Sequence, residues 1–280
     1  MKQVLYLFVF TVIFSNLIFA QNKQNPTIPL TDEQSQSTVP DEKTEESNYK
    51  KYNVQLNYST ESLSRNLGIW RSTSLYMERK FKNRQLVWMN YTMSNRNSVR
   101  DQYLEVGTYK PLKNRWAITA EAGVSPTHKF AGKFSVKGEI EKGFANGVVI
   151  HGGSRFTAFT AIKATTVYGQ AEKYWGNNRA AYTLSVTNIT TAGTAPSHRF
   201  SYNRYYGERV NNFGVAASVG RENENLGLLS GILRSKTWSV SVSEKHWLTK
   251  NFAVNVNATL HRQGTLYYRR GLNFGFHYRF

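Results

Sequence analysis

The segment GLNFGFHYRF at residues 271–280 decides the fold of this chain. Large apolar or aromatic side chains occupy every second position of it, at Leu272, Phe274, Phe276, Tyr278 and Phe280. A period of two indicates a β-strand, because successive side chains on a strand point to opposite faces. Such a strand can be half-buried in a soluble sandwich or can lie in the wall of a membrane barrel. The rest of the chain distinguishes these alternatives.

The same alternation recurs from residue 51 to the end of the chain, and it predicts fourteen strands. Their expected spans are 51–60, 68–79, 83–93, 100–110, 113–124, 131–142, 146–158, 163–175, 179–189, 197–207, 211–221, 236–247, 250–261 and 267–280. After residue 50 no stretch shows a helical period. Strands of about 9–11 residues have the length that a tilted strand needs to cross a bilayer.

The connections between these strands favour the membrane alternative. Every other connection is tight, as in KFKNR, KPLKNR, FANG and LTKN. The intervening ones are expected to be looser, and RENENLGLLSGILRSK at 221–236 is the longest. Short turns on one side and longer loops on the other are typical of outer-membrane barrels. Nine aromatic residues lie beside the tight turns, as in an interfacial belt: Trp116, Phe144, Trp175, Tyr206, Phe213, Trp247, Phe252, Tyr278 and Phe280.

The start of the chain resembles a secretory signal peptide. One lysine follows Met1, and an apolar run extends to about Ala20. An N-terminal membrane anchor is the alternative. Residues 21–50 are rich in polar residues and acids and show no apolar period, so we expect a disordered periplasmic tether there, or a partner-binding tail. The chain contains no cysteine, which excludes disulfides and a lipid-modified N-terminal cysteine.

These features together predict an all-β protein with a single domain at 51–280. That domain is expected to be a transmembrane antiparallel β-barrel of about 14 strands, with 12 strands or a soluble secreted β-protein as alternatives. The predicted location is the outer membrane of a Gram-negative bacterium. A terminal strand ending in an aromatic residue resembles the signal that the barrel-assembly machinery recognises, and Phe280 is the expected signal residue.

Three stretches resemble a known family. They are AEKYWGNNRAAYTLSVTN at 171–188, SYNRYYGERVNNFGVAASVGRENE at 201–224 and YYRRGLNFGFHYRF at 267–280. The chain is similar in these stretches, and over most of 51–280, to the YaiO family of outer-membrane β-barrels. The motifs are turn glycines and aromatic residues of the belt. The resemblance implies an outer-membrane barrel and carries over no catalytic residues. Some members of that family occur with carbohydrate-handling partners, which favours a role near polysaccharide export or surface glycans.

Alternation also predicts which charged side chains face the barrel interior. The expected set comprises Glu78, Glu105, Arg115, Glu121, Lys133, Lys137, Glu139, Glu141, Arg155, Glu172, Arg269 and Arg279, together with His151, His261 and His277. One interpretation is a structural one, in which opposite charges on neighbouring strands form ladders that brace the barrel. The other is a charged constriction that selects permeating solutes. The two are compatible.

The predicted function is a channel, or an accessory barrel linked to surface glycans. A lipid-modifying enzyme is the main alternative, with His151 and Ser154, or His246 with Ser243 and Glu244, as its candidate residues; a structural or adhesive barrel is the third. No nucleophile motif supports catalysis. No metal site and no cofactor are predicted, because the six histidines are scattered and cysteine is absent.

The barrel segment is strongly basic, and this bears on its partners. It carries 32 lysines and arginines against 12 acids, a formal charge of +20. An extracytoplasmic location argues against nucleic acid as the partner. Outer-membrane lipids and lipopolysaccharide are expected instead, and Lys129, Lys133, Arg234 and Lys236 near the longer loops are candidates for contact with their phosphates. Polysaccharide is a further expected partner.

Overall fold

The computed structural model of the chain describes residues 50–190, 193–207, 211–225 and 232–280. The predicted signal peptide at 1–20 lies outside these residues, as does the predicted tether apart from Lys50. Within the described residues, no helix has the length and apolar character needed to cross a membrane.

Fourteen strands make up almost the whole of the described chain. The first seven are β1 (Tyr52–Leu63), β2 (Ile69–Lys80), β3 (Leu86–Arg96), β4 (Val99–Pro111), β5 (Trp116–Val124), β6 (Phe134–Gly143) and β7 (Val148–Ala158). The second seven are β8 (Lys163–Trp175), β9 (Asn178–Ile189), β10 (Gly193–Tyr206), β11 (Asn211–Asn225), β12 (Ile232–Trp247), β13 (Phe252–Gln263) and β14 (Tyr267–Arg279). The short 3₁₀ turn η1 (Lys113–Arg115) separates β4 from β5.

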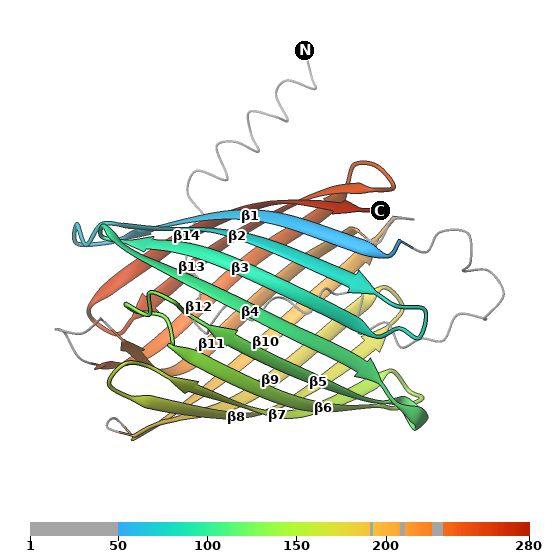
Figure 1. Ribbon diagram of the computed structural model, residues 1–280, viewed down its shortest axis with the longest axis horizontal. Coiled ribbons are helices and arrows are strands. Elements are labelled where there is room, and N and C mark those ends of the chain that lie inside the picture. The colour runs from blue at the N-terminus through green and yellow to red at the C-terminus, as the bar shows by residue number, and fades with distance from the viewer. Residues whose placement is uncertain (1–49, 191–192, 208–210, 226–231) are drawn as a thin grey trace, which may run out of the picture.

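The strands form one closed antiparallel barrel in which each strand pairs with its neighbours in sequence (Figure 1). The first and last strands complete the circle, with β1 and β14 in register from Asn53 opposite Arg279 to Leu63 opposite Arg269. Closure leaves no sheet edge, so every strand finds backbone partners on both sides. The prediction of a fourteen-stranded barrel is therefore confirmed, and the alternatives of twelve strands and of a sandwich do not hold.

The terminal strand divides its residues as the alternation predicts. Phe274, Phe276 and Tyr278 point outward, and each is about half exposed, at 47%, 52% and 48%. His277 points inward and is buried. Gly275 also points inward, where a Cβ atom would lie 2.1 Å from the side-chain oxygens of both Asn57 and Asn255, so a larger residue there would displace these two side chains. The apolar face of the strand is thus the outer face of the barrel.

The aromatic belt has one exception. Trp116, Phe144 and Trp175 are exposed on the outside beside the tight turns, as expected. Trp247 instead points into the barrel and is 3% exposed, with the Arg279 guanidinium 3.7 Å from the centre of its ring. The prediction of Trp247 in the belt is therefore wrong: it is the last residue of β12, where the alternation directs its side chain inward.

The loops differ from the expected pattern, because several strands extend further than the sequence indicates. SNRNSV was expected to be a loose loop, but β3 reaches Arg96 and β4 begins at Val99, so only Asn97 and Ser98 connect them. Both residues have positive φ, 49° and 71°, as in a tight hairpin turn. Likewise β11 extends to Asn225 and β12 begins at Ile232. The difference in length between the two ends is accordingly smaller than predicted.

Apolar side chains fill part of the interior beside β1, β2, β3 and β14. One cluster comprises Leu63, Trp70 and Tyr267 at the loop end, and the other comprises Tyr76, Leu86 and Trp88 near the opposite end. These large side chains narrow the lumen on that side of the barrel. The remaining wall, from β4 to β13, is lined mainly by charged and small polar side chains.

The two faces of β14 should respond differently to the same substitution. Phe274→Arg places a guanidinium on the outer face near mid-strand, at a cost of about 2–4 kcal/mol in folding free energy when that face meets lipid. Asn273→Arg, one residue away, places the same group in the lumen, where water solvates it, at a cost of about 1 kcal/mol or less. Reversible unfolding in lipid vesicles measures both variants against the parent. An Asn273→Arg variant less stable than Phe274→Arg would contradict the assigned faces.

Candidate functional site

A continuous chain of ion pairs crosses the inner wall from β4 to β9. It contains nine residues: Glu105, Glu121, Lys137, Glu139, Glu141, His151, Arg155, Glu172 and Arg179. We refer to these nine residues as the charge ladder. All but Arg179 and His151 belong to the charged set proposed from the alternation, and His151 was also expected inside.

The first part of the charge ladder is centred on Arg155 of β7. Its guanidinium reaches Glu105 of β4, with Nη1 3.2 Å from Oε2, and also hydrogen-bonds Glu121 of β5. Lys137 of β6 continues the chain, with Nζ 3.0 Å from Glu121 Oε1 and 3.7 Å from Glu139 Oε2. Two cations and three carboxylates therefore alternate across four strands.

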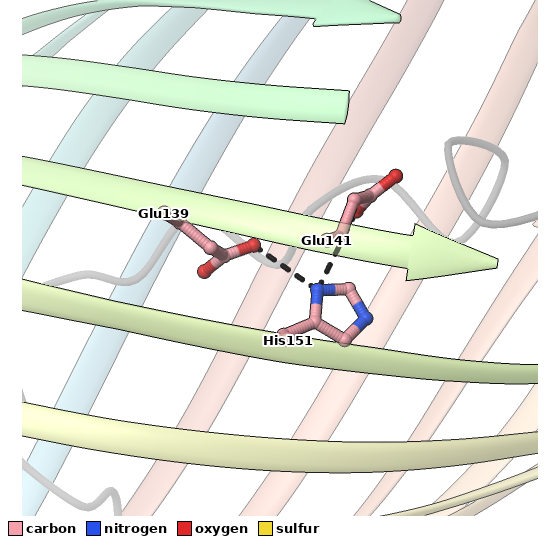
Figure 2. A group of neighbouring side chains, drawn as sticks. All are labelled: Glu139, Glu141 and His151. Carbon is pink, nitrogen blue, oxygen red and sulfur yellow. Dashed lines mark hydrogen bonds and ion pairs between the residues drawn. The ribbon is translucent and has the colours of Figure 1, made fainter. Parts of the chain in front are cut away.

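The second part converges on His151 of β7 (Figure 2). Its Nδ1 lies 3.2 Å from Glu139 Oε1 and 3.4 Å from Glu141 Oε2, and both glutamates project from β6. The other ring nitrogen, Nε2, lies 3.5 Å from Glu172 Oε1 on β8. Arg179 of β9 completes the charge ladder, with Nη2 2.7 Å from Glu172 Oε1.

The strand register explains why these residues meet. Lys137 stands directly opposite Glu121 on one side and Arg155 on the other. Glu141 stands directly opposite His151. Side chains directly opposite each other on the same face of an antiparallel pair have Cβ atoms about 4.5–5.5 Å apart, which is within reach of opposite charges. Pairing of neighbouring strands therefore explains the contacts of Lys137 with Glu121 and of Glu141 with His151, whereas the long Arg155 side chain reaches past β6 to Glu121 and Glu105.

The charge ladder is buried and carries a surplus of acids. The side chains of Glu105, Lys137 and Glu172 are only 1%, 4% and 2% exposed. Its five glutamates outnumber its three permanent cations, which leaves a formal charge of −2 when His151 is neutral. Removing water from charges is costly, so each carboxylate in such a site depends on its partners.

The other residues of the predicted charged set lie elsewhere. Glu78 accepts a hydrogen bond from Tyr76 on β2, and Arg269 on β14 is 1% exposed with Nε 3.8 Å from Glu61 Oε2. Arg115 and Lys133 are exposed and immediately precede β5 and β6, which begin at Trp116 and Phe134, and neither belongs to the charge ladder.

The candidate catalytic pairs are separated by the barrel wall. His151 points inward, whereas Ser154 is exposed on the outer face. Ser243 points inward and His246 outward, where the Tyr206 hydroxyl lies 3.4 Å from His246 Nδ1 and donates to Glu244 Oε1 at 2.8 Å. Neither serine can therefore be activated by its candidate histidine.

The sequence reasoning overlooked Arg199 on β10. It stands opposite Thr183 and Ser218, both on the inner face, so its side chain lies inside the barrel. Even so, Arg199 is exposed, and it makes no ion pair with any residue that the structure describes. Exposure of an inward-facing side chain means that solvent-accessible space adjoins it. The strand itself was predicted at 197–207, but Arg199 was not included in the expected inward-facing set.

Comparison with known proteins identifies the family of this chain and proteins of similar fold. The family model described as the YaiO membrane beta barrel domain matches residues 51–225, more than half of the chain. The chain belongs to the YaiO family. This confirms the resemblance found in the sequence, and the YaiO barrel is an outer-membrane β-barrel protein similar in fold to porins and channels.

Several solved outer-membrane barrels share this fold at low sequence identity. The barrel resembles "CymD monoaromatic hydrocarbon channel" with a TM-score of 0.59 and 7% identity, over 82% of this chain and 89% of that one. It resembles "Bacterial polysaccharide outer membrane secretin" with a TM-score of 0.52 and 9% identity, over 83% and 99%. For Omp33 of Acinetobacter baumannii the TM-score is 0.52 at 11% identity, over 82% and 99%. None of the curated proteins matches the chain in sequence.

Arg155 and Arg199 both face inward but differ in their dependence on partners, and this gives a stability prediction. Arg155→Met leaves the buried carboxylate of Glu105 without its cation and leaves Glu121 with Lys137 alone, which should cost about 3–5 kcal/mol of unfolding free energy. Arg199→Met removes a guanidinium that pairs with no described carboxylate, and should change stability by about 0.5 kcal/mol. Reversible unfolding followed by tryptophan fluorescence compares the two. Equal losses would show that the charge ladder does not stabilise the barrel.

Proposed function

We propose that the protein is a channel for anionic solutes, with acidic glycans as the favoured class. The observation that carries the proposal is Arg199, which faces the lumen of β10, is exposed to solvent there and pairs with no described carboxylate. A basic side chain that lines an aqueous passage lowers the energy of a passing anion. The charge ladder, in contrast, is largely buried, holds its cations in ion pairs with its own carboxylates and forms a supporting wall.

The shape of the interior supports a passage along β10 to β13. The inward-facing side chains there are short and polar, and many are only half-buried: Ser201, Asn203, Ser241, Ser243, Asn255 and Asn257. Short side chains fill less of the interior than the long charged ones of β4 to β9. We therefore expect the lumen to be widest between the charge ladder and this serine- and asparagine-rich wall.

The charges of the interior are distributed unevenly. Among the inward-facing side chains that the structure describes on β10, on β11 as far as Gly220, on β12 from Ser235 and on β13 and β14, the charged ones are all basic: Arg199, Lys245, Arg269 and Arg279. The described inward-facing glutamates lie on β1, β2, β4, β5, β6 and β8. This separation of charge favours anions on one side of the lumen.

A link to glycans rests on two further points. Serine hydroxyls and asparagine amides can donate and accept hydrogen bonds, so the wall from β10 to β13 can exchange hydrogen bonds with sugar hydroxyls. The fold also resembles a protein described as a polysaccharide outer-membrane secretin. We therefore propose that carboxylated or phosphorylated glycans of the cell surface pass through the barrel or are handled beside it.

The same proposal includes the cellular setting. The barrel would reside in the outer membrane of a Gram-negative bacterium, with the barrel-assembly machinery recognising Phe280 during insertion. Lys129, Lys133 and Lys236 are exposed at the end where the loops lie, so they would face the phosphates of lipopolysaccharide. The side chain of Arg234, the fourth base expected to contact these phosphates, is not among those that the structure describes.

Planar-bilayer recording tests the channel directly. The purified barrel should give single-channel openings, and the reversal potential in a KCl gradient should show preference for chloride. Arg199→Glu should lower the chloride-to-potassium permeability ratio by about two-fold or more, because it replaces the exposed lumenal cation with an anion. An oligosaccharide of uronic acids should block the parent current more strongly than a neutral oligosaccharide of equal length.

Arg204→Glu is the matched control for this experiment. Arg204 lies on the same strand but is exposed on the outer face, so its substitution should leave the permeability ratio unchanged. A silent bilayer, or a selectivity that Arg199→Glu and Arg204→Glu alter equally, would exclude Arg199 as a lumenal selectivity residue and would remove the basis of the proposal.

A further inference from the structure

Three side chains of the charge ladder converge on one point of the inner wall, near the tight turn between β6 and β7 (Figure 2). His151 Nδ1 lies 3.2 Å from Glu139 Oε1 and 3.4 Å from Glu141 Oε2. In a tetrahedral zinc site with bonds of about 2.0–2.1 Å, neighbouring ligand atoms lie about 3.3–3.4 Å apart. The two separations therefore match adjacent corners of such a site.

We propose that Glu139, Glu141 and His151 bind a divalent metal ion of the zinc type. Imidazole nitrogen and carboxylate oxygen are both ordinary ligands of Zn²⁺. Three protein ligands leave a fourth position for water or a solute group. The side chain of Glu141 is 19% exposed, against 5% for Glu139 and 4% for His151, so the ion would enter past Glu141 from the lumen.

Two tyrosines hold the carboxylates in the orientation that this site needs. The Tyr168 hydroxyl donates a hydrogen bond to Glu139 Oε2, and the Tyr109 hydroxyl donates one to Glu141 Oε1 at 2.8 Å. Each tyrosine thus engages the oxygen that is not directed at His151. The other two oxygens, Glu139 Oε1 and Glu141 Oε2, are the ones that converge on His151 Nδ1. Hydrogen bonds of this kind to the remote atoms of the ligands are a regular feature of metal sites.

The far side of the imidazole gives independent support. His151 is 4% exposed, and its Nε2 has no hydrogen-bond partner within the described structure. That nitrogen faces Glu172 Oε1 at 3.5 Å. A metal ion on Nδ1 places the ring proton on Nε2, where it is directed at the Glu172 carboxylate. Carboxylate, histidine and metal then form the arrangement that orients most metal-binding histidines.

The charge of the surroundings also fits a divalent cation. The charge ladder has five glutamates and three permanent cations, a formal charge of −2 with neutral His151. One divalent ion would neutralise this surplus. Lys137 is the nearest competing cation on Glu139, at 3.7 Å from Oε2, and that is the oxygen directed away from His151.

Equilibrium dialysis against ZnCl₂ tests the site, with bound zinc counted by mass spectrometry on full-length barrel that has been stripped with EDTA. We expect one Zn²⁺ per barrel at micromolar free zinc. His151→Gln and Glu141→Gln should each weaken binding about 100-fold, and Tyr109→Phe about 10-fold, because it releases one ligand from its fixed orientation. Zinc should also raise the unfolding temperature of the parent but not that of His151→Gln.

His277→Gln is the matched control, since His277 is also buried inside the barrel but hydrogen-bonds Asn255 and meets no carboxylate in the described contacts. It should bind zinc as the parent does. Each variant is checked for folding by gel electrophoresis, in which a folded barrel migrates more slowly after boiling than before. If a variant of a ligand residue fails to fold, Tyr109→Phe still tests the site, because it changes no ligand. Absence of stoichiometric zinc, or binding that His151→Gln and Tyr109→Phe leave unchanged, would overturn the proposal. The result does not depend on whether the lumen conducts.

Discussion

Backbone pairing between β1 and β14 is the constraint on which the rest of the structure depends. Unpaired N–H and C=O groups in lipid cost several kcal/mol each, so a membrane-spanning sheet is stable only when its edges meet. Here the first strand of the domain pairs with the last one in the chain over eleven consecutive positions. Closure fixes the strand number at fourteen and assigns each residue to one of two environments, the outer face or the lumen.

The interior of the barrel then has to hold the side chain of every second residue on each strand. The barrel meets this requirement in two ways. On β4 to β9, long charged side chains form ion pairs within and across strands in a buried wall, which is centred on Arg155 and His151. On β10 to β13, short polar side chains leave space beside Arg199. The supporting wall and the proposed passage are therefore consequences of side-chain length and charge on opposite sides of one barrel.

The sequence predicted the barrel well, because alternation and closure are local rules repeated fourteen times. It also placed Glu105, Glu139 and Glu172 inside. It was wrong for Trp247, which turns inward at the last residue of β12, and strand ends are harder to predict in general, since Arg115 and Lys133 precede their strands. Alternation alone could not show that Glu139, Glu141 and His151 converge, because that depends on the register of the β6–β7 hairpin, in which Glu141 faces His151. The tight GFANG connection is the signal that could have revealed this register.

The most direct test of closure uses engineered cysteines, which the absence of native cysteine permits. Ser59 on β1 stands opposite Asn273 on β14. Residues in that position have Cα atoms about 4.5–5.5 Å apart, a separation that a disulfide can bridge. The double variant Ser59→Cys with Asn273→Cys should therefore form an intramolecular disulfide on mild oxidation of the folded barrel. The pair Ser59→Cys with His277→Cys, displaced by four residues along β14, should not. Cross-linking in the displaced pair alone, or in neither pair, would contradict the closed fourteen-stranded barrel.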